Sequence, residues 1–540
     1  MEEEKKIRMR DLKTKKPFRR ITPPKISGFE GVYCDNDEPG YDPGTNWFTT
    51  VTQADFLREY YPTGHRINDP NYYPDIWRIV DEPVYNGDGS QMTDEYGNAA
   101  TTTKYYCEMV PRYSFAYQQI IALNHIIHAT GNDVQHELSV VEPTKAQQVL
   151  FDGMTTDWIR LGLEEAWYQS FKSREITADT AFVGFLGKDN ELKWRVFSFL
   201  DGDVLYPHFN SFGELELLAR VSHQYDKDGF EVKETIEVWD STYYSVYKAN
   251  VGAGRTIIDR LKGMIGLDGY ELVSRTTHGF PSIPVAYMRD DDGPGWTPSQ
   301  SGIECYELSF SQMAHNNQAY GEAILVLRSR REMPPNITRG LNGSIKEIDL
   351  GEDDEAKFLE GQSASQSYMS QIETTDEMIY RQSNCVKTPT DLKSGDTPAS
   401  AVKLLFAPSL NQAMADGNEC KPFLDQMWRI HACAYGIRNN CLLDAVSLPV
   451  TNWIKPFVHL SESAISADLV ALVGAKVISR KTAAERASFY SKPGEMERIM
   501  NEKKQEQDID LVYEFEQLKA SKKLNEQQTG SQPQSQKTDE

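Results

Sequence analysis

The spacing of apolar side chains divides the chain into helical and strand-forming stretches. Residues 114–128 have helical spacing and predict an amphipathic helix that ends at Gly131 and Asn132. A second, stronger helix is predicted from Thr144 to Phe171. The apolar positions of the first helix are Phe115, Ile120, Leu123, Ile126 and Ile127.

The period then changes from helical spacing to strict alternation of apolar and polar residues. Alternation over short runs separated by Asp-, Asn- and Gly-containing turns is typical of antiparallel strands. The pattern therefore predicts an α+β fold, with two helices followed by a strand meander. Strands are expected at residues 192–196, 215–221, 232–238, 243–247 and 283–288.

A heptad stripe over residues 302–327 predicts a helix about 39 Å long. Its opposite face is polar but nearly uncharged, whereas an isolated surface helix usually has more charge. Two interpretations stay open: an ordinary core helix, or a helix packed beside copies of itself. The stripe consists of Ile303, Tyr306, Phe310, Met313, Asn317, Tyr320, Ile324 and Leu327.

Two blocks of opposite charge flank a short excursion after this helix, which includes a strand-like run at residues 344–350. Taken singly, each block is typical of a solvated face. Together they would suit head-to-tail contacts between subunits of a ring. The basic residues are Arg328, Arg330, Arg331 and Arg339, and the acidic ones are Glu352, Asp353, Asp354 and Glu355.

The second half of the chain is mainly helical. A helix is expected at residues 363–382, followed by an irregular stretch that contains Lys387 and Lys393. Helical spacing resumes from Ala399 to about Arg438, although Pro408 and Pro422 should kink or break that helix. Further helices are expected within residues 461–520.

The two ends of the chain and the region after the first end have little periodicity. Residues 1–27 carry many basic residues and only four acids, which predicts either a solvated, flexible arm or an arm that binds an acidic partner or a neighbouring subunit. Residues 28–110 are expected to form loops with short elements, and residues 526–540 to be disordered.

Composition narrows the class of protein. The chain has 540 residues, so two or more domains are expected. A formal charge of −23 argues against binding nucleic acid by coating its phosphates with cations. No apolar run reaches the roughly 18 residues of a membrane span, and no secretory signal is evident. The seven cysteines form no C-x-x-C pair, which favours reduced thiols in a cytoplasmic setting.

Motifs of catalysis are absent from the sequence. The segment Gly184–Lys188 only superficially resembles a phosphate-binding loop, because Phe182 and Asp189 occupy positions where that motif requires Gly and Ser or Thr. There is no H-E-x-x-H or G-x-S-x-G sequence, and the Asp290–Asp292 run is explained by a turn. We therefore expect no enzyme activity, no cofactor and no metal site.

The order of elements, together with three short segments, resembles the portal proteins of tailed double-stranded DNA bacteriophages. The segment 278–285 is similar to the family's strand before the first stem helix, and 394–401 to the start of its long helix. The segment 477–482 is similar to a helix start near the family's C-terminus. The resemblance covers roughly residues 110–520.

This resemblance implies a ring, usually of twelve subunits, at one capsid vertex. It also implies a division of the chain into regions with separate roles, including a two-helix stem, an α/β clip and a helical crown. The implied regions are a basic arm (1–27), a wing (28–300 and a long kinked helix, 399–445), stem helices (301–327 and 363–383), a clip (328–362), a channel loop (384–398), a crown (446–525) and a tail (526–540).

The implied function is a conduit for genome packaging and ejection, located in the virion after assembly in the host cytoplasm. The implied partners are other copies of the chain, the major capsid and scaffolding proteins, the terminase motor, head–tail adaptors and DNA bound without sequence specificity; no membrane is involved. Lys387 and Lys393 would make weak contacts with DNA, and Ile324→Asp would block ring assembly. The alternative is a head–tail adaptor or tail component that docks no motor.

Overall fold

The computed structural model describes part of the chain, in two compact units. One unit comprises Met1–Thr388 and Phe406–Phe457, and the other Pro389–Leu405 and Val458–Glu540. The described residues are 15–16, 18–21, 48–86, 92–93, 100–225, 231–250, 271–320, 324–328, 337–339, 345–348, 355–359, 365–387, 404–458, 462–480, 483, 498–505, 515–519 and 521.

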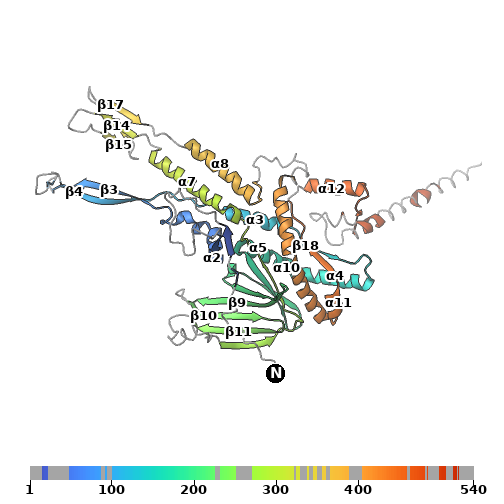
Figure 1. Cartoon of the computed structure of the whole chain (residues 1–540). Coiled ribbons are helices and arrows are strands. Elements are labelled where there is room, and N and C mark those ends of the chain that lie inside the picture. Colours follow the sequence, from blue (N-terminus) through green and yellow to red (C-terminus); the bar gives the residue numbers. More distant parts are fainter. Residues whose placement is uncertain are drawn as a thin grey trace, which may run out of the picture. The chain divides into compact units, whose positions relative to one another are not determined.

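Four helices build the main core of the first unit (Figure 1). The helix predicted from Thr144 to Phe171 is in fact two, because Gly162 adopts a left-handed conformation with φ of +67° between them. Thr144 caps the first of the two through a capping box with Gln147. The helices are α3 (Tyr117–Thr130), α4 (Lys145–Arg160), α5 (Leu163–Thr177) and α10 (Ala407–Asn439).

The buried face of α3 differs from the predicted one. Ile121, Ala122 and Ile126 face the core, whereas Ile120 and Leu123, two of the predicted apolar positions, are exposed. Ile127 is exposed as well. The large aliphatic residues surround α3 on several sides, so their spacing alone does not identify the buried side.

Two antiparallel sheets confirm the predicted meander. A three-stranded sheet of order β13-β6-β7 packs beside a five-stranded sheet of order β12-β11-β10-β9-β8. Gly184 lies opposite Trp194 inside the first sheet, so the segment that resembled a phosphate loop is a strand. The strands are β6 (Asp179–Leu186), β7 (Leu192–Phe197), β8 (Val204–Phe209), β9 (Leu215–Tyr225), β10 (Glu231–Trp239), β11 (Tyr243–Asn250), β12 (Glu271–Thr277) and β13 (Val285–Arg289), with the short helix η3 (Phe199–Asp201) before β8.

The N-terminal region is more ordered than the sequence suggested. The prediction of a solvated arm is wrong for residues 15–16 and 18–21, because Lys15 pairs with the buried Asp179 and Phe18 packs edge-on against Phe56. A hairpin also forms within the region expected to be mostly loops. The elements are β1 (Phe18–Ile21), β2 (Phe48–Val51), α2 (Gln53–Tyr60), η1 (Pro62–Gly64), η2 (Arg66–Asn68), β3 (Ile76–Pro83) and β4 (Thr101–Glu108).

The helix predicted to reach residue 327 ends earlier. Helix α7 spans Gln300–Tyr320 after the short helix η4 (Thr297–Ser299), and Ile324 and Leu327 lie in a strand that pairs with residues 355–359. Their spacing fits a helix, but a distant strand partner decides the structure. The elements that follow are β14 (Ile324–Arg328), β15 (Ile337–Arg339), β16 (Ile345–Ile348), β17 (Glu355–Leu359) and α8 (Ser365–Gln382).

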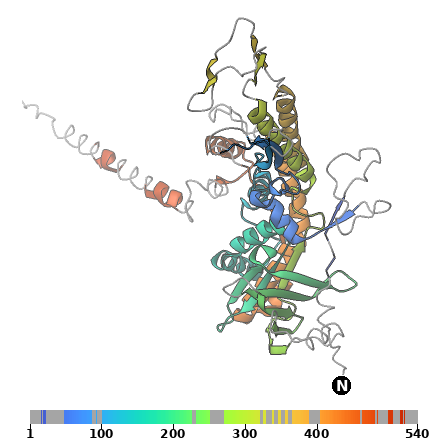
Figure 2. The same cartoon turned by 90° about the vertical axis from the view of Figure 1, so that its left-hand side faces the viewer.

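Helix α10 is one continuous helix (Figure 2). Pro408 occupies its first turn, where the missing N–H costs no hydrogen bond, and the helix continues through Pro422. Three further elements complete the first unit: β5 (Gln135–Leu138), α11 (Leu442–Ser447) and β18 (Val450–Trp453), the last paired with β5.

The second unit contains α12 (Glu462–Gly474) and helical residues at 498–505 and 515–519, in agreement with the predicted C-terminal helices. Across the part of the chain that the structure describes, no helix is both long enough and apolar enough to cross a membrane.

Candidate functional site

Helices α7 and α8 form an antiparallel pair (Figure 1). Near the start of α7, Ser299 Oγ donates a hydrogen bond to the Ile379 carbonyl at 2.9 Å. Ten residues further along α7, Ser309 Oγ accepts a hydrogen bond from Gln371 Nε2 at 3.0 Å. Residue numbers therefore rise along one helix as they fall along the other. The pair lies within the residues predicted as the stem, and strands β14–β17 lie within those predicted as the clip; both roles stay predictions.

Three residues of the predicted stripe on α7 pack against other parts of their own subunit. Tyr306 packs against Tyr117 with ring centroids 5.2 Å apart, and Phe310 packs against Phe115 at 5.1 Å. Ile303 is fully buried in the main core. Of the remaining stripe residues on α7, Met313 is half-buried and Asn317 exposed, and the side chain of Tyr320 lies outside the described part of the structure. For Ile303, Tyr306 and Phe310 these contacts favour the interpretation as a core helix, and packing of the stripe on neighbouring copies stays a prediction.

A buried carboxylate fixes α7 to the segments around it. Glu307 Oε1 lies 2.6 Å from His65 Nδ1 and accepts a hydrogen bond from the Phe115 backbone at 2.8 Å. Burial opposes a charge on His65, but the hydrogen bond to Glu307 raises the pKa of that imidazole. The ion pair is nearly solvent-free, so it holds α7 in one position relative to η2 and the start of α3.

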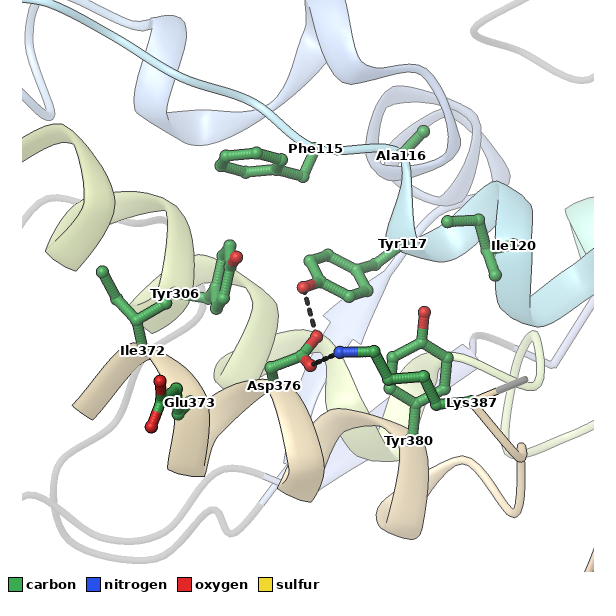
Figure 3. Close-up of a pocket in the computed structure, with 10 residues that line it drawn as sticks. All are labelled: Phe115, Ala116, Tyr117, Ile120, Tyr306, Ile372, Glu373, Asp376, Tyr380 and Lys387. Carbon is green, nitrogen blue, oxygen red and sulfur yellow. Dashed lines mark hydrogen bonds and ion pairs between the residues drawn. The ribbon is translucent and has the colours of Figure 1, made fainter. Parts of the chain in front are cut away.

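An aromatic pocket of about 450 Å³ lies where α8 meets α7 and the start of α3 (Figure 3). On its floor, Tyr117 Oη donates to Asp376 Oδ1 at 2.5 Å, and Lys387 Nζ lies 2.7 Å from Asp376 Oδ2. Burial and the hydrogen bond to Asp376 raise the pKa of Tyr117. The pocket is lined by Phe115, Ala116, Tyr117, Ile120, Tyr306, Ile372, Glu373, Asp376, Tyr380 and Lys387.

Lys387, a predicted DNA-contact residue, forms an ion pair within its own subunit. Its ammonium group pairs with Asp376 on α8 although two-thirds of its side chain is exposed. The hydrogen bond to Asp376 raises the pKa of Lys387, so the group stays charged but is neutralised within the subunit. Lys393, the second predicted DNA-contact residue, lies outside the described residues.

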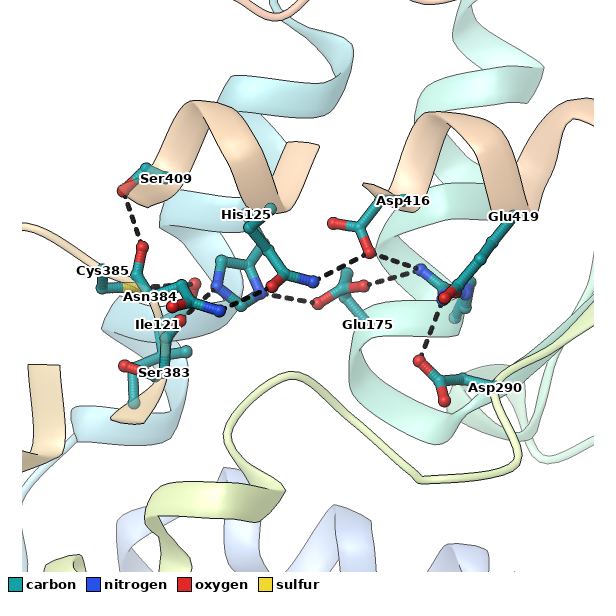
Figure 4. Close-up of polar contacts among 12 residues, drawn as sticks. Ile121, His125, Glu175, Asp290, Ser383, Asn384, Cys385, Ser409, Asp416 and Glu419 are labelled. Carbon is teal, nitrogen blue, oxygen red and sulfur yellow. Dashed lines mark hydrogen bonds and ion pairs between the residues drawn. The ribbon is translucent and has the colours of Figure 1, made fainter. Parts of the chain in front are cut away.

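Beyond the end of α8, a buried polar network joins α3, α5 and α10 (Figure 4). His125 Nε2 donates to the Ser383 carbonyl at 2.8 Å, and its Nδ1 faces Glu175 Oε2 at 3.3 Å. Burial opposes protonation, but hydrogen bonds with Cys385 and Glu175 raise the pKa of His125 well above its usual value. With acceptors at both ring nitrogens, the imidazole is held as a cation.

Arg174 is the centre of this network and is almost completely buried. One guanidinium faces four carboxylates, so the network holds more negative than positive charge. The partners are Glu175 at 3.2 Å, Asp416 at 3.5 Å, Asp290 at 2.9 Å and Glu419 at 2.6 Å.

Burial and the neighbouring negative charge raise the pKa of two of these carboxyl groups. Burial and the neighbouring Glu175 raise the pKa of Asp416 to about 7. Burial raises the pKa of Asp290 to about 6. Asp416 Oδ2 is buried and has no hydrogen-bond partner among the described residues, so no donor stabilises a negative charge on this oxygen.

Further hydrogen bonds extend the network from the end of α8 to the first turns of α10. Asn384 Nδ2 donates to Gln412 Oε1 at 2.9 Å, and Ser409 Oγ donates to the Asn384 carbonyl at 3.0 Å. Gln412 in turn donates to Asp416 at 3.1 Å. The point where the chain leaves α8 is therefore fixed to α3, α5 and α10.

The clip strands bring two of the predicted charged residues together within one subunit. Antiparallel pairing places Arg328 of β14 directly opposite Glu355 of β17. Arg339 lies in β15, which pairs with β16 rather than with the acidic block. The other predicted members, Arg330, Arg331, Glu352, Asp353 and Asp354, lie outside the described residues.

Sequence reasoning missed the groups that define the pocket and the network, including Tyr117, Asp376, His125 and Arg174. The available signal was weak and local: Arg174 and Glu175 stand next to Ile176 near the end of a predicted helix, but Lys172 and Ser173 beside them are polar as well. Charges at such positions are buried only when partners from other elements reach them. Within the described residues, no three or more His, Cys, Asp or Glu side chains are grouped as ligands for a metal ion.

Comparison with known families gives one match. A model of the family described as phage portal protein, SPP1 Gp6-like, matches residues 183–508, which is more than half of the chain. The chain belongs to this family. This confirms the predicted resemblance and the predicted α+β portal fold. A search of curated proteins found no match.

A phage portal protein is a structural protein that forms a homo-oligomeric ring and associates with the capsid, which places this portal protein in the virion. The matched residues include the five-stranded sheet, the α7–α8 pair, the clip strands and α10. Residues before 183 lie outside the match, so His125, Arg174, Tyr117 and the β3–β4 hairpin belong to the part of this portal protein that the family model does not cover.

Proposed function

We propose that this portal protein forms a ring of about twelve subunits at one capsid vertex, and that the ring conducts double-stranded DNA during packaging and ejection. The observation that carries this proposal is the antiparallel α7–α8 pair with strands at one end and the connection to α10 at the other. Copies of a rigid helix pair arranged around an axis would make a continuous channel wall. The half-buried Met313 and the exposed Asn317 of α7 are available for contacts between neighbouring stems.

The charge of the chain supports a conduit rather than a DNA-binding surface. A net charge of −23 per subunit repels phosphates, so DNA can move through the bore without being held. Lys387, which would otherwise attract the backbone, is neutralised by Asp376. The remaining contacts with DNA would be weak and independent of sequence.

The clip is the proposed docking platform for the terminase motor and, after packaging, for head–tail adaptor proteins. It is a separate set of strands, β14–β17, at the end of the stem away from α10. The charged residues of the clip would contribute to contacts between subunits in addition to the Arg328–Glu355 pairing. The major capsid and scaffolding proteins would surround the ring during assembly in the host cytoplasm.

A clip deletion tests motor docking. Residues 329–354 are replaced by a short Gly-Ser linker, and the variant is supplied in place of the natural portal during phage assembly. We expect rings and capsids without packaged DNA, because the motor has no platform. The alternative of an adaptor that docks no motor predicts DNA-filled heads that lack tails, and that outcome would overturn the proposal. A matched control replaces Phe212, an exposed residue of the β8–β9 turn, with Ser.

A further inference from the structure

The hairpin formed by β3 and β4 carries an apolar face that no other described part of its own subunit covers. Its register places Trp77 opposite Cys107 and Ile79 opposite Tyr105, so these four side chains share one face. Trp77, Ile79 and Tyr105 are each about two-thirds exposed, and Cys107 is exposed as well. None of the four is charged.

A surface of this kind is unfavourable in an isolated subunit. Within the described residues, β3 and β4 pair only with each other, and a lone two-stranded hairpin is marginally stable in water. Exposed strands rich in aromatic and β-branched residues also promote uncontrolled association. Two paired eight-residue strands therefore point to a surface that is covered in the assembled protein.

We propose that the Trp77–Ile79–Tyr105–Cys107 face packs against a neighbouring copy of this chain in the portal ring. A ring of identical subunits provides a second copy at fixed distance on each side, and a head-to-tail contact lets an apolar face on one subunit meet a different surface on the next. The uncharged character of the face suits burial against protein rather than contact with DNA phosphates.

The hairpin lies before residue 183, outside the part of the chain that matches the family. It would therefore be a contact that this portal protein adds to those of the shared stem and clip. The proposal rests on the ring itself and not on DNA conduction, so a ring that conducts no DNA would leave it standing.

Photo-cross-linking identifies the occupant of this face directly. Tyr105 is replaced in the full-length chain by the photo-reactive residue p-benzoyl-phenylalanine, purified rings are irradiated, and the products are separated by mass. We expect a covalent product of two chains. The control carries the same residue at Phe212, which is even more exposed but lies on the β8–β9 turn, and should give little or none of this product.

A paired substitution tests whether the contact contributes to assembly. The double variant Trp77→Ser, Tyr105→Ser should raise the concentration needed for ring formation at least about tenfold, because buried aromatic residues dominate such interfaces. Phe212→Ser should leave it unchanged. Rings that form normally in the double variant and give no two-chain product at position 105 would overturn the proposal. A product with a capsid or scaffolding protein in procapsids, and none between chains, would overturn it too.

Discussion

Buried charge at the end of α8 has the clearest measurable consequences at the scale of single residues. Arg174 faces four carboxylates, and His125 carries a second positive charge close to Glu175. Burial, together with the nearby negative charge of Glu175, raises the pKa of Asp416 and of Asp290 above the usual value for an aspartate. The network stabilises the junction of four elements but becomes less favourable as these two carboxyl groups ionise.

Asp416→Asn should stabilise the protein in a pH-dependent way. The pKa of Asp416 is raised from 3.8 to about 7 by folding, so the folded state binds a proton that the unfolded state lacks, and this group's contribution to stability falls as pH rises across that window. Asn cannot ionise. The variant's advantage in the free energy of unfolding should grow from about pH 4 to about pH 7 and then level off, at on the order of 2–4 kcal/mol.

Denaturant unfolding of both proteins across that pH range measures the difference. Asp152→Asn, on the exposed side of α4, is the matched control and should leave the difference flat. A constant advantage or a constant loss for Asp416→Asn at all pH values would contradict the proposed protonation of this carboxyl group.

Glu307→Ala should be among the most damaging single substitutions in the stem. It removes a buried partner from His65 and an acceptor from the Phe115 backbone. Breaking a buried ion pair from one side costs about 3–5 kcal/mol, because the remaining charge stays without compensation. Thermal unfolding gives the measurement, and Glu373→Ala, exposed on α8, should lower the midpoint far less. Equal midpoints for the two variants would show that Glu307 does not anchor α7.

At the scale of elements, local patterns predicted which segments are helical better than where those segments end. The helix at 363–382 follows from periodicity, because its less exposed side chains, such as Tyr368, Ile372 and Ile379, recur along one face. Ile324 and Leu327 continue the heptad spacing of α7 in the sequence, but they do not belong to the helix. Those residues instead pair with Leu359 and Ala356, a partner more than twenty-five residues away that no local pattern reveals.

The break between α4 and α5 depends on backbone conformation. Gly162 has φ of +67°, and no atom lies within 4 Å of the position a Cβ would take, so a substitution there meets backbone strain alone. Gly162→Ala should cost about 1–2 kcal/mol in the free energy of unfolding. Gly162→Asn should cost less, because Asn tolerates the left-handed region. Denaturant unfolding compares the two, and equal losses would contradict the strain argument.

For the molecule as a whole, the order of elements was sufficient to predict the family. For the candidate site, the sequence predicted only some of the residues and not their partners. The order of the α7–α8 pair, the strands between its two helices and α10 agrees with the predicted order of elements, while the roles of stem and clip stay predictions. The Arg174 network and the aromatic pocket draw their residues from four or more separated segments, so their assembly depends on the fold itself. The sequence identified Lys387 as a candidate site residue, but it did not identify Asp376, with which Lys387 forms an ion pair.

Ring formation by the full-length chain is the central claim at this scale, and the most direct test is a mass measurement combined with negative-stain electron microscopy, performed with and without the scaffolding protein. The account predicts rings of about a dozen subunits with a central hole, either alone or once scaffold is present. A compact monomer or dimer that persists with scaffold would contradict it.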